Sequence, residues 1–191
     1  MLSCTMTRLG SKGAARPLTK DEIRRLTTSA SPRDRAIIWC CLGAGLRVGE
    51  ACRLLVGQLD PCGSIVVDRH SAKSRETRTV FLSDEAKPFV LEWLSLRGPV
   101  APQLPLFPSR KGGQPIKSGS QLVEQLMSKC GIVGASSHSL RRTHATGLRD
   151  QKADLQVVKT QLGHSSIQVT ETYLAFYPHR HREQVAGLTL L

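Results

Sequence analysis

Two pairs of side chains in this chain have residue types and a spacing that suit the chemistry of phosphate esters. Arg47 is followed three residues later by Glu50, and His138 precedes Arg141 by the same interval. Residues three apart share one face of a helix. A guanidinium stays charged at any working pH and offers forked donors to phosphate oxygens, and an imidazole can transfer protons near neutrality. Taken singly, each has an ordinary alternative as a solvated cation, a basic helix face or a structural histidine.

A possible nucleophile lies near the C-terminal end. Tyr173 follows His164 by nine residues, and Tyr177 is the other tyrosine of the chain. A phenol has an ordinary pKa near ~10, so one that attacks phosphorus needs a base to take its proton. The alternative is an aromatic ring packed in the core.

The composition favours a polyanionic partner. The 191 residues include 27 Lys and Arg against 15 Asp and Glu, a formal charge of +12, and a surplus of this size is typical of nucleic-acid binding. The six cysteines have no zinc-finger spacing, and several lie in apolar helical patterns, which predicts reduced thiols, no metal and a cytoplasmic setting. No stretch approaches the roughly 18 apolar residues of a membrane span.

The hydrophobic pattern predicts a mainly helical α+β domain with one small antiparallel hairpin. Capping signals place helix starts at Thr19, at Ser31 or Pro32, at Ser83, and at Ser136 or Ser137. A short helix is expected within 46–56, and further helices over 118–131, 152–163 and 165–176, with a last one over 178–186. The hairpin strands are expected at 64–68 and 77–82, with Lys73 near the tip.

Together these segments resemble the boxes of the tyrosine site-specific recombinases, the phage integrase family. GAGLRVGEACRL is similar to the first arginine box, HSLRRTHATGL to the H-x-L-R-[HR] box, and LGHSSIQVTETY to the box that ends in the nucleophile. KSRETRTVFL is similar to the hairpin of the catalytic lysine. The resemblance implies a catalytic set consisting of Arg47, Lys73, His138, Arg141, His164 and the nucleophile Tyr173, because Tyr177 lacks the family spacing.

The resemblance covers residues 17–177 and implies a recombinase catalytic domain. Residues 1–16 are expected to form a flexible basic arm, and residues 178–191 to dock on a neighbouring protomer or else on their own core. The additional N-terminal core-binding domain of typical members is expected to be absent. Glu50 is expected to orient an arginine or histidine. DNA contacts are expected from nearby basic residues, namely Arg75, Arg78, Arg142 and Lys111.

The implied activity is cleavage and rejoining of double-stranded DNA through a 3′-phosphotyrosine, by a homotetramer on DNA, without metal or cofactor. Two alternatives stay open. One is a type IB topoisomerase that relaxes a single duplex. The other is a DNA-binding regulator whose catalytic residues are idle, with its affinity supplied by the positive charge.

Overall fold

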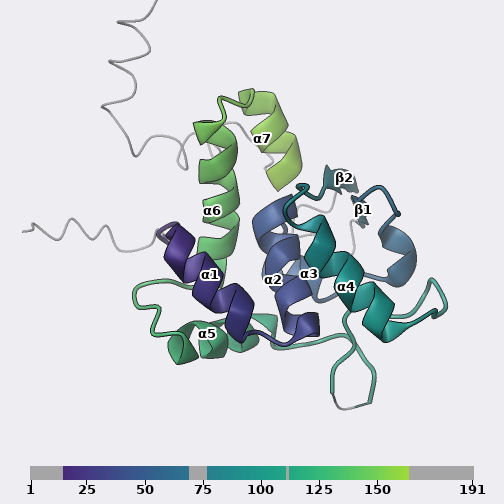
Figure 1. Cartoon of the computed structure of the whole chain (residues 1–191). Coiled ribbons are helices and arrows are strands. Elements are labelled where there is room, and N and C mark those ends of the chain that lie inside the picture. Colours follow the sequence, from purple (N-terminus) through teal and green to yellow (C-terminus); the bar gives the residue numbers. More distant parts are fainter. Residues whose placement is uncertain (1–14, 69–76, 111, 164–191) are drawn as a thin grey trace, which may run out of the picture.

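The computed structural model describes residues 15–68, 77–110 and 112–163 (Figure 1). The helices in these segments are α1 (Lys20–Ser29), α2 (Pro32–Ala44), α3 (Val48–Ala51), α4 (Lys87–Arg97), α5 (Gly119–Lys129), α6 (Ser137–Asp150) and α7 (Leu155–Leu162). Two strands, β1 (Ser64–Val67) and β2 (Arg78–Phe81), and the 3-10 turn η1 (Val56–Gln58) complete the set. The predicted class, mainly helical with a small antiparallel sheet, is confirmed.

Capping residues set the helix boundaries where the sequence indicated them. Thr19 and Glu22 form a capping box at the start of α1, and Ser31 caps α2. Gly45 ends α2 with φ 67°, a left-handed conformation that glycine adopts without steric cost. Ser136 caps α6, and Gly163 ends α7 with φ 62°. Gly163 lies against Arg78, and the Gly45 carbonyl accepts from Arg141.

The predicted start of α4 at Ser83 is wrong. The helix begins at Lys87, and residues 84–86 form a turn in which the Ala86 amide donates to the Ser83 carbonyl at 3.0 Å. Pro88 therefore lies in the first turn instead of bending a longer helix. Proline suits that position because its missing N–H would have no partner there and its φ is already helical.

The inward face of α5 is formed by Val123 and Met127. Leu122, Leu126 and Cys130 are only partly buried, whereas Val123 and Met127 are buried in the core. Val123 and Met127 are one turn apart on the same side of the helix, so together they form the stripe that α5 presents to the core.

The core is built around α2, which is buried along most of its length. It packs against α4 on one side and against α6 on another (Figure 1). Trp39 of α2 stacks on Phe89 of α4 with ring centroids 4.7 Å apart. The thiols of Cys40, Cys41 and Cys52 are free and buried within this core, and burial raises the pKa of Cys40 to about 12, so the group behaves as a small hydrophobe.

The hairpin lies beside α2 and α7. Its strands pair antiparallel, with Ser64 opposite Phe81 and Val67 opposite Arg78. Ile65, Val67 and Val80 are buried, so one face of the hairpin closes the core. The predicted hairpin is confirmed, while Lys73 at its expected tip lies outside the described residues.

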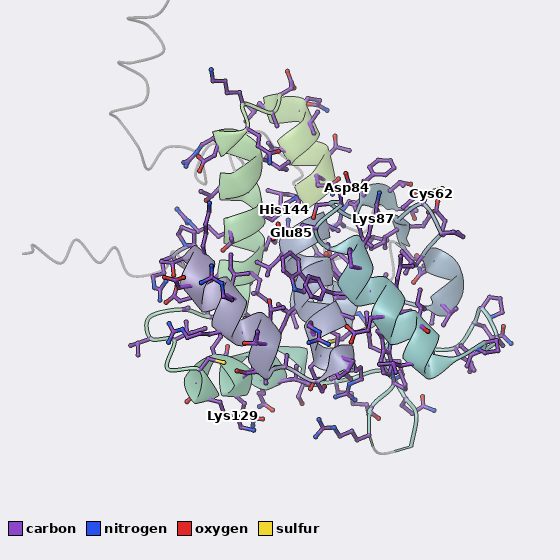
Figure 2. The ribbon with its side chains drawn as sticks, viewed as in Figure 1. Cys62, Asp84, Glu85, Lys87, Lys129 and His144 are labelled. Carbon is purple, nitrogen blue, oxygen red and sulfur yellow. The ribbon has the colours of Figure 1, made fainter. Side chains whose placement is uncertain are left out.

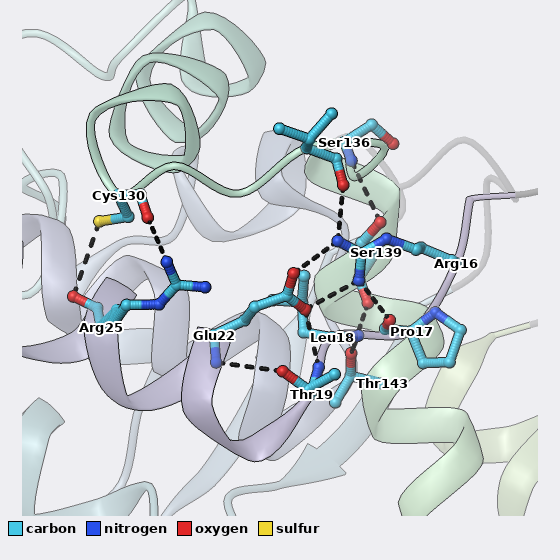
Figure 3. Close-up of polar contacts among 11 residues, drawn as sticks. Arg16, Pro17, Leu18, Thr19, Glu22, Arg25, Cys130, Ser136, Ser139 and Thr143 are labelled. Atoms are coloured by element: carbon cyan, nitrogen blue, oxygen red, sulfur yellow. Dashed lines mark hydrogen bonds and ion pairs between the residues drawn. The ribbon is translucent and has the colours of Figure 1, made fainter.

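The segment before α1 ties that helix to α6 (Figure 3). Arg16 donates two hydrogen bonds to the Glu22 carboxylate, at 2.8 and 2.5 Å, and a third to the Val133 carbonyl at 2.6 Å. The Leu18 amide donates to Thr143 Oγ1 of α6 at 2.8 Å. These contacts hold the N-terminal half of α6, the helix that carries Arg141.

Candidate active site

Glu50 is the centre of the most highly charged buried group among the described residues. It lies in the first turn of α3, where its Oε2 accepts from the Arg47 amide at 2.9 Å and its Oε1 from Arg47 Nη1 at 2.9 Å. The first contact satisfies an amide at the helix start that has no backbone partner. The Glu50 side chain is 1% exposed and that of Arg47 is 28% exposed, so the pair lies at the edge of the core with the guanidinium reaching solvent.

Arg78 brings a second guanidinium to the same carboxylate from β2. Its Nη2 donates to Glu50 Oε2 at 2.8 Å and its Nη1 to Oε1 at 3.3 Å, a forked contact that uses both carboxylate oxygens. Its side chain is 8% exposed and packs against the end of α7. A Cβ at Gly163 would lie 2.6 Å from Arg78 Nε, so only glycine leaves room for this arginine.

Arg141 brings the third guanidinium from α6. Its Nη1 donates to the Gly45 carbonyl at 2.7 Å and lies 4.0 Å from Glu50 Oε2, and its Nη2 donates to the Leu162 carbonyl. The residue is 2% exposed. Arg141 therefore joins the ends of α2 and α7, two helix termini whose carbonyl groups lack partners within their own helices.

Arg47, Glu50, Arg78 and Arg141 are called the Glu50 cluster below. Burial alone would raise the pKa of Glu50, but the hydrogen bonds and charges of Arg78 and Arg47 outweigh it and hold that pKa below its ordinary value. The carboxylate is thus ionised at neutral pH. Three guanidiniums against one carboxylate leave a surplus of 3 − 1 = +2 in the cluster. Such a site attracts an anion, and a phosphate diester has both the charge and the oxygen geometry to suit it.

The structure brings three of the predicted site residues together, namely Arg47, Glu50 and Arg141. His138 is exposed in the first turn of α6, one turn before Arg141. Arg78 and Arg142 are both largely covered by protein, with Arg142 8% exposed. Their predicted DNA contacts stay predictions. Five further predicted site residues lie outside the described residues, namely Lys73, Arg75, Lys111, His164 and Tyr173.

Sequence reasoning missed that Arg78 belongs to the cluster. Its register in β2 points it to the buried side beside Glu50, and no helical spacing links it to Arg47 or Arg141. The available signal was the alternation of 77–82, which places residues 78, 80 and 82 on one face of the strand. A charged residue on the same face as the buried Val80 and Leu82 needs a buried counter-charge.

His144 is a structural histidine beside the cluster. His144 belongs to α6, and it lines a cleft of about 790 Å³ together with Glu85. Figure 2 labels both side chains. Its Nδ1 is 2.8 Å from the Leu42 carbonyl, which identifies that nitrogen as the protonated one. Burial, with the charge of Arg141 acting in the same direction, lowers the pKa of His144 to about 4. The ring is therefore neutral at physiological pH and no cationic partner for DNA.

The described parts of the chain contain neither a candidate metal site nor a candidate membrane span. In residues 15–68, 77–110 and 112–163, the His, Cys, Asp and Glu side chains do not form any group of three suited to a metal ion. None of the helices within those same ranges combines the length and the hydropathy needed to span a bilayer.

Comparison with known proteins identifies the fold as that of a tyrosine recombinase catalytic domain. Residues 16–180 match the model of the phage integrase family, and the chain belongs to that family. It is 33% identical over 163 residues to tyrosine recombinase XerC of Corynebacterium efficiens, covering 84% of this chain and 49% of the relative. The chain thus spans about half the length of that relative.

Solved structures give the same fold. The catalytic domain of bacteriophage HP1 integrase superposes with a TM-score of 0.63 at 27% identity, covering 93% of this chain and 97% of the other. XerH recombinase, in a post-cleavage complex with its palindromic difH substrate, superposes with a TM-score of 0.70 at 25% identity, covering 92% of this chain and 54% of the other.

Proposed function

We propose that this chain cleaves and rejoins double-stranded DNA in site-specific recombination, with Tyr173 as the nucleophile. The observation that carries the proposal is the Glu50 cluster, in which Arg47, Arg78 and Arg141 converge on one carboxylate and leave two positive charges in surplus. A phosphodiester placed at this cluster would supply the missing negative charge. XerH recombinase, which has a related fold, is bound to its difH substrate in a post-cleavage complex, and this adds support to the proposal.

The charge of the cluster suits the chemistry of the step. The transition state of attack on a phosphodiester gathers additional negative charge on the nonbridging oxygens, and fixed guanidiniums stabilise that charge without reorganising. Glu50 holds Arg47 in place from 2.9 Å, and the carbonyls of Gly45 and Leu162 hold Arg141. The protein thereby establishes the positions of the cations before the substrate arrives.

In the proposed step, side chains supply the nucleophile and donate or accept each proton that is transferred. The phenol oxygen of Tyr173 bonds to phosphorus while the bond from phosphorus to the 5′ oxygen breaks. The phenol proton passes to His138, and the departing 5′ oxygen takes a proton from Lys73, with His164 donating to a nonbridging oxygen. Rejoining reverses these transfers when a 5′ hydroxyl attacks the phosphotyrosine. The scheme calls for no metal ion or nucleotide cofactor.

A nicked suicide duplex tests the nucleophile. A set of overlapping duplexes, each with one nick, is made from the DNA sequence that flanks the gene. Cleavage beside the nick releases a short fragment, so the enzyme stays trapped on the DNA. We expect a covalent complex with the natural chain and with the control Tyr177→Phe, and none with Tyr173→Phe, whose DNA affinity stays within about threefold because it loses one oxygen and no charge. Trapping by Tyr173→Phe would move the nucleophile elsewhere, and no trapping by the natural chain would favour a DNA-binding regulator.

Recombination is distinguished from relaxation by strand transfer. We propose that the chain acts as a homotetramer on two DNA sites, so two cleavable duplexes of different length should yield hybrid products. Covalent trapping and plasmid relaxation without hybrid products would identify a type IB topoisomerase instead.

A further inference from the structure

Gln161, near the end of α7, joins three backbone groups that belong to other elements. Its Nε2 donates to the Phe81 carbonyl at 2.7 Å and to the Ala44 carbonyl at 3.3 Å, and its Oε1 accepts from the Phe81 amide at 3.4 Å. Phe81 is the last residue of β2 and Ala44 the last of α2. One partly buried carboxamide thus connects a strand and two helix ends.

Gln161 contacts the edge of β2, in a sheet to which the described residues contribute β1 and β2. In an antiparallel pair, alternate residues turn their N–H and C=O groups away from the partner strand. The Leu82 amide donates to Gly63 across the hairpin at 2.9 Å, and the preceding residue, Phe81, turns its own amide and carbonyl to the open edge. The carboxamide of Gln161 supplies both an acceptor and a donor there, as a peptide group of a third strand would.

The three groups that Gln161 holds are next to those that place the arginines. Ala44 precedes Gly45, and Gln161 precedes Leu162, and the carbonyls of Gly45 and Leu162 are the two acceptors of Arg141. Phe81 terminates the four-residue strand that begins with Arg78. Gln161 therefore fixes the distance between the Gly45 and Leu162 carbonyls, which bind Arg141. It also holds both carbonyls beside β2, the strand that carries Arg78.

Close packing at this point leaves little tolerance for a shift. A Cβ at Gly163 would meet Arg78 Nε at 2.6 Å, and one at Gly45 would meet Leu162 Cδ2 at 3.1 Å. A displacement of α7 by a fraction of an ångström would therefore move Arg78 or Arg141 as well. Misplacement of charge-stabilising groups by about 1 Å can lower a rate by roughly a hundredfold.

We propose that Gln161 is a positioning residue for DNA cleavage, which holds β2 and the end of α2 against α7 so that Arg78 and Arg141 keep their places in the Glu50 cluster. The inference rests on the proposed function. The hydrogen bonds of Gln161 go to backbone groups of Phe81 and Ala44, so it acts through the backbone of its neighbours.

The test is a single-turnover cleavage rate on the suicide duplex, with DNA affinity measured separately. Gln161→Met keeps the length of the side chain and removes its polar atoms, and we expect its cleavage rate to fall by about tenfold or more while the dissociation constant for DNA changes by less than about threefold. Gln161→Glu keeps the acceptor and loses both donors, so its rate should fall further. An unchanged rate in Gln161→Met would overturn the inference.

Two controls separate positioning from loss of stability. Gln156→Met makes the same exchange at an exposed site on α7, and Val90→Ala removes volume from the core within α4. Both should cleave at the natural rate at temperatures well below their melting points. If Val90→Ala, matched in melting temperature to Gln161→Met, showed the same loss of rate, the effect would be general destabilisation and the inference would fail.

A double-mutant cycle with Arg78 identifies the route of the effect. If Gln161 acts by placing Arg78, then Gln161→Met should cost much less in an Arg78→Lys background than alone, because the group that it places has already been replaced. Strict additivity would overturn this route. Absence of cleavage by the natural chain would overturn the proposed function and this inference together, whereas cleavage that is insensitive to Gln161 would overturn the inference alone.

Discussion

Replacing Glu50 with glutamine removes the one negative charge of the Glu50 cluster while keeping its shape. The carboxylate accepts four hydrogen bonds from Arg47 and Arg78 and is 1% exposed. Breaking a buried ion pair by neutralising one partner costs about 3–5 kcal/mol, and the retained amide oxygen keeps part of the hydrogen bonding. We therefore expect Glu50→Gln to lower the free energy of unfolding by about 3 kcal/mol.

The predicted loss of unfolding free energy can be measured as a fall in the melting temperature. In a chain of this length about 1 kcal/mol corresponds to roughly 2–4 °C, so Glu50→Gln should melt roughly 6–12 °C below the natural chain in a calorimetric scan. The matched control is Glu92→Gln. Glu92 is 43% exposed and pairs with Arg35 at the surface, where neutralisation costs less than about 1 kcal/mol.

The cause can be separated from a simple packing defect by adding an anion. Without Glu50, three guanidiniums face one another, so sulfate should raise the melting temperature of Glu50→Gln by more than that of the natural chain or of Glu92→Gln. A Glu50→Gln variant that melts within about 2 °C of the natural chain would refute the reasoning, because the cluster would then not depend on its carboxylate.

Two further perturbations address the neighbours of the cluster. Gly163→Ala should lower the free energy of unfolding by about 1–3 kcal/mol in urea titrations and should reduce covalent trapping. Alanine at φ 62° is strained, and its Cβ would meet Arg78 Nε at 2.6 Å. The control is Gly147→Ala, because the space around a Cβ at Gly147 is open. His144→Asn should remove a pH dependence. The pKa of His144 is about 4 in the folded chain against an ordinary 6.5, so its contribution to stability is complete above about 6.5 and is lost as the pH falls toward 4. From pH 7 to 5 the natural chain should lose about 1–2 kcal/mol more than His144→Asn, and equal losses would contradict the assignment.

From the sequence we predicted the family, most of the described secondary structure, and Arg47, Glu50 and Arg141 of the Glu50 cluster as site residues. Capping residues such as Thr19 and Ser31 act within one turn of chain, so their effect can be read locally, as it was for α1 and α2. Arg47 and Glu50 are likewise local partners, three residues apart at the start of α3. Pro88 was the exception, because its preference for a first turn outweighed the capping signal of Ser83.

Tertiary structure alone decided which distant groups meet. Arg78 reaches Glu50 from 28 residues away, and Gln161 reaches Phe81 from 80 residues away, through the register of a hairpin and the packing of a helix end. The alternation of 77–82 could place Arg78 on the buried face of its strand, but it could not identify Glu50 as the partner. The spacing along the chain between two packed elements depends on the loops between them. A buried carboxylate is stable only where opposite charges surround it, and only the folded chain brings three guanidiniums to Glu50.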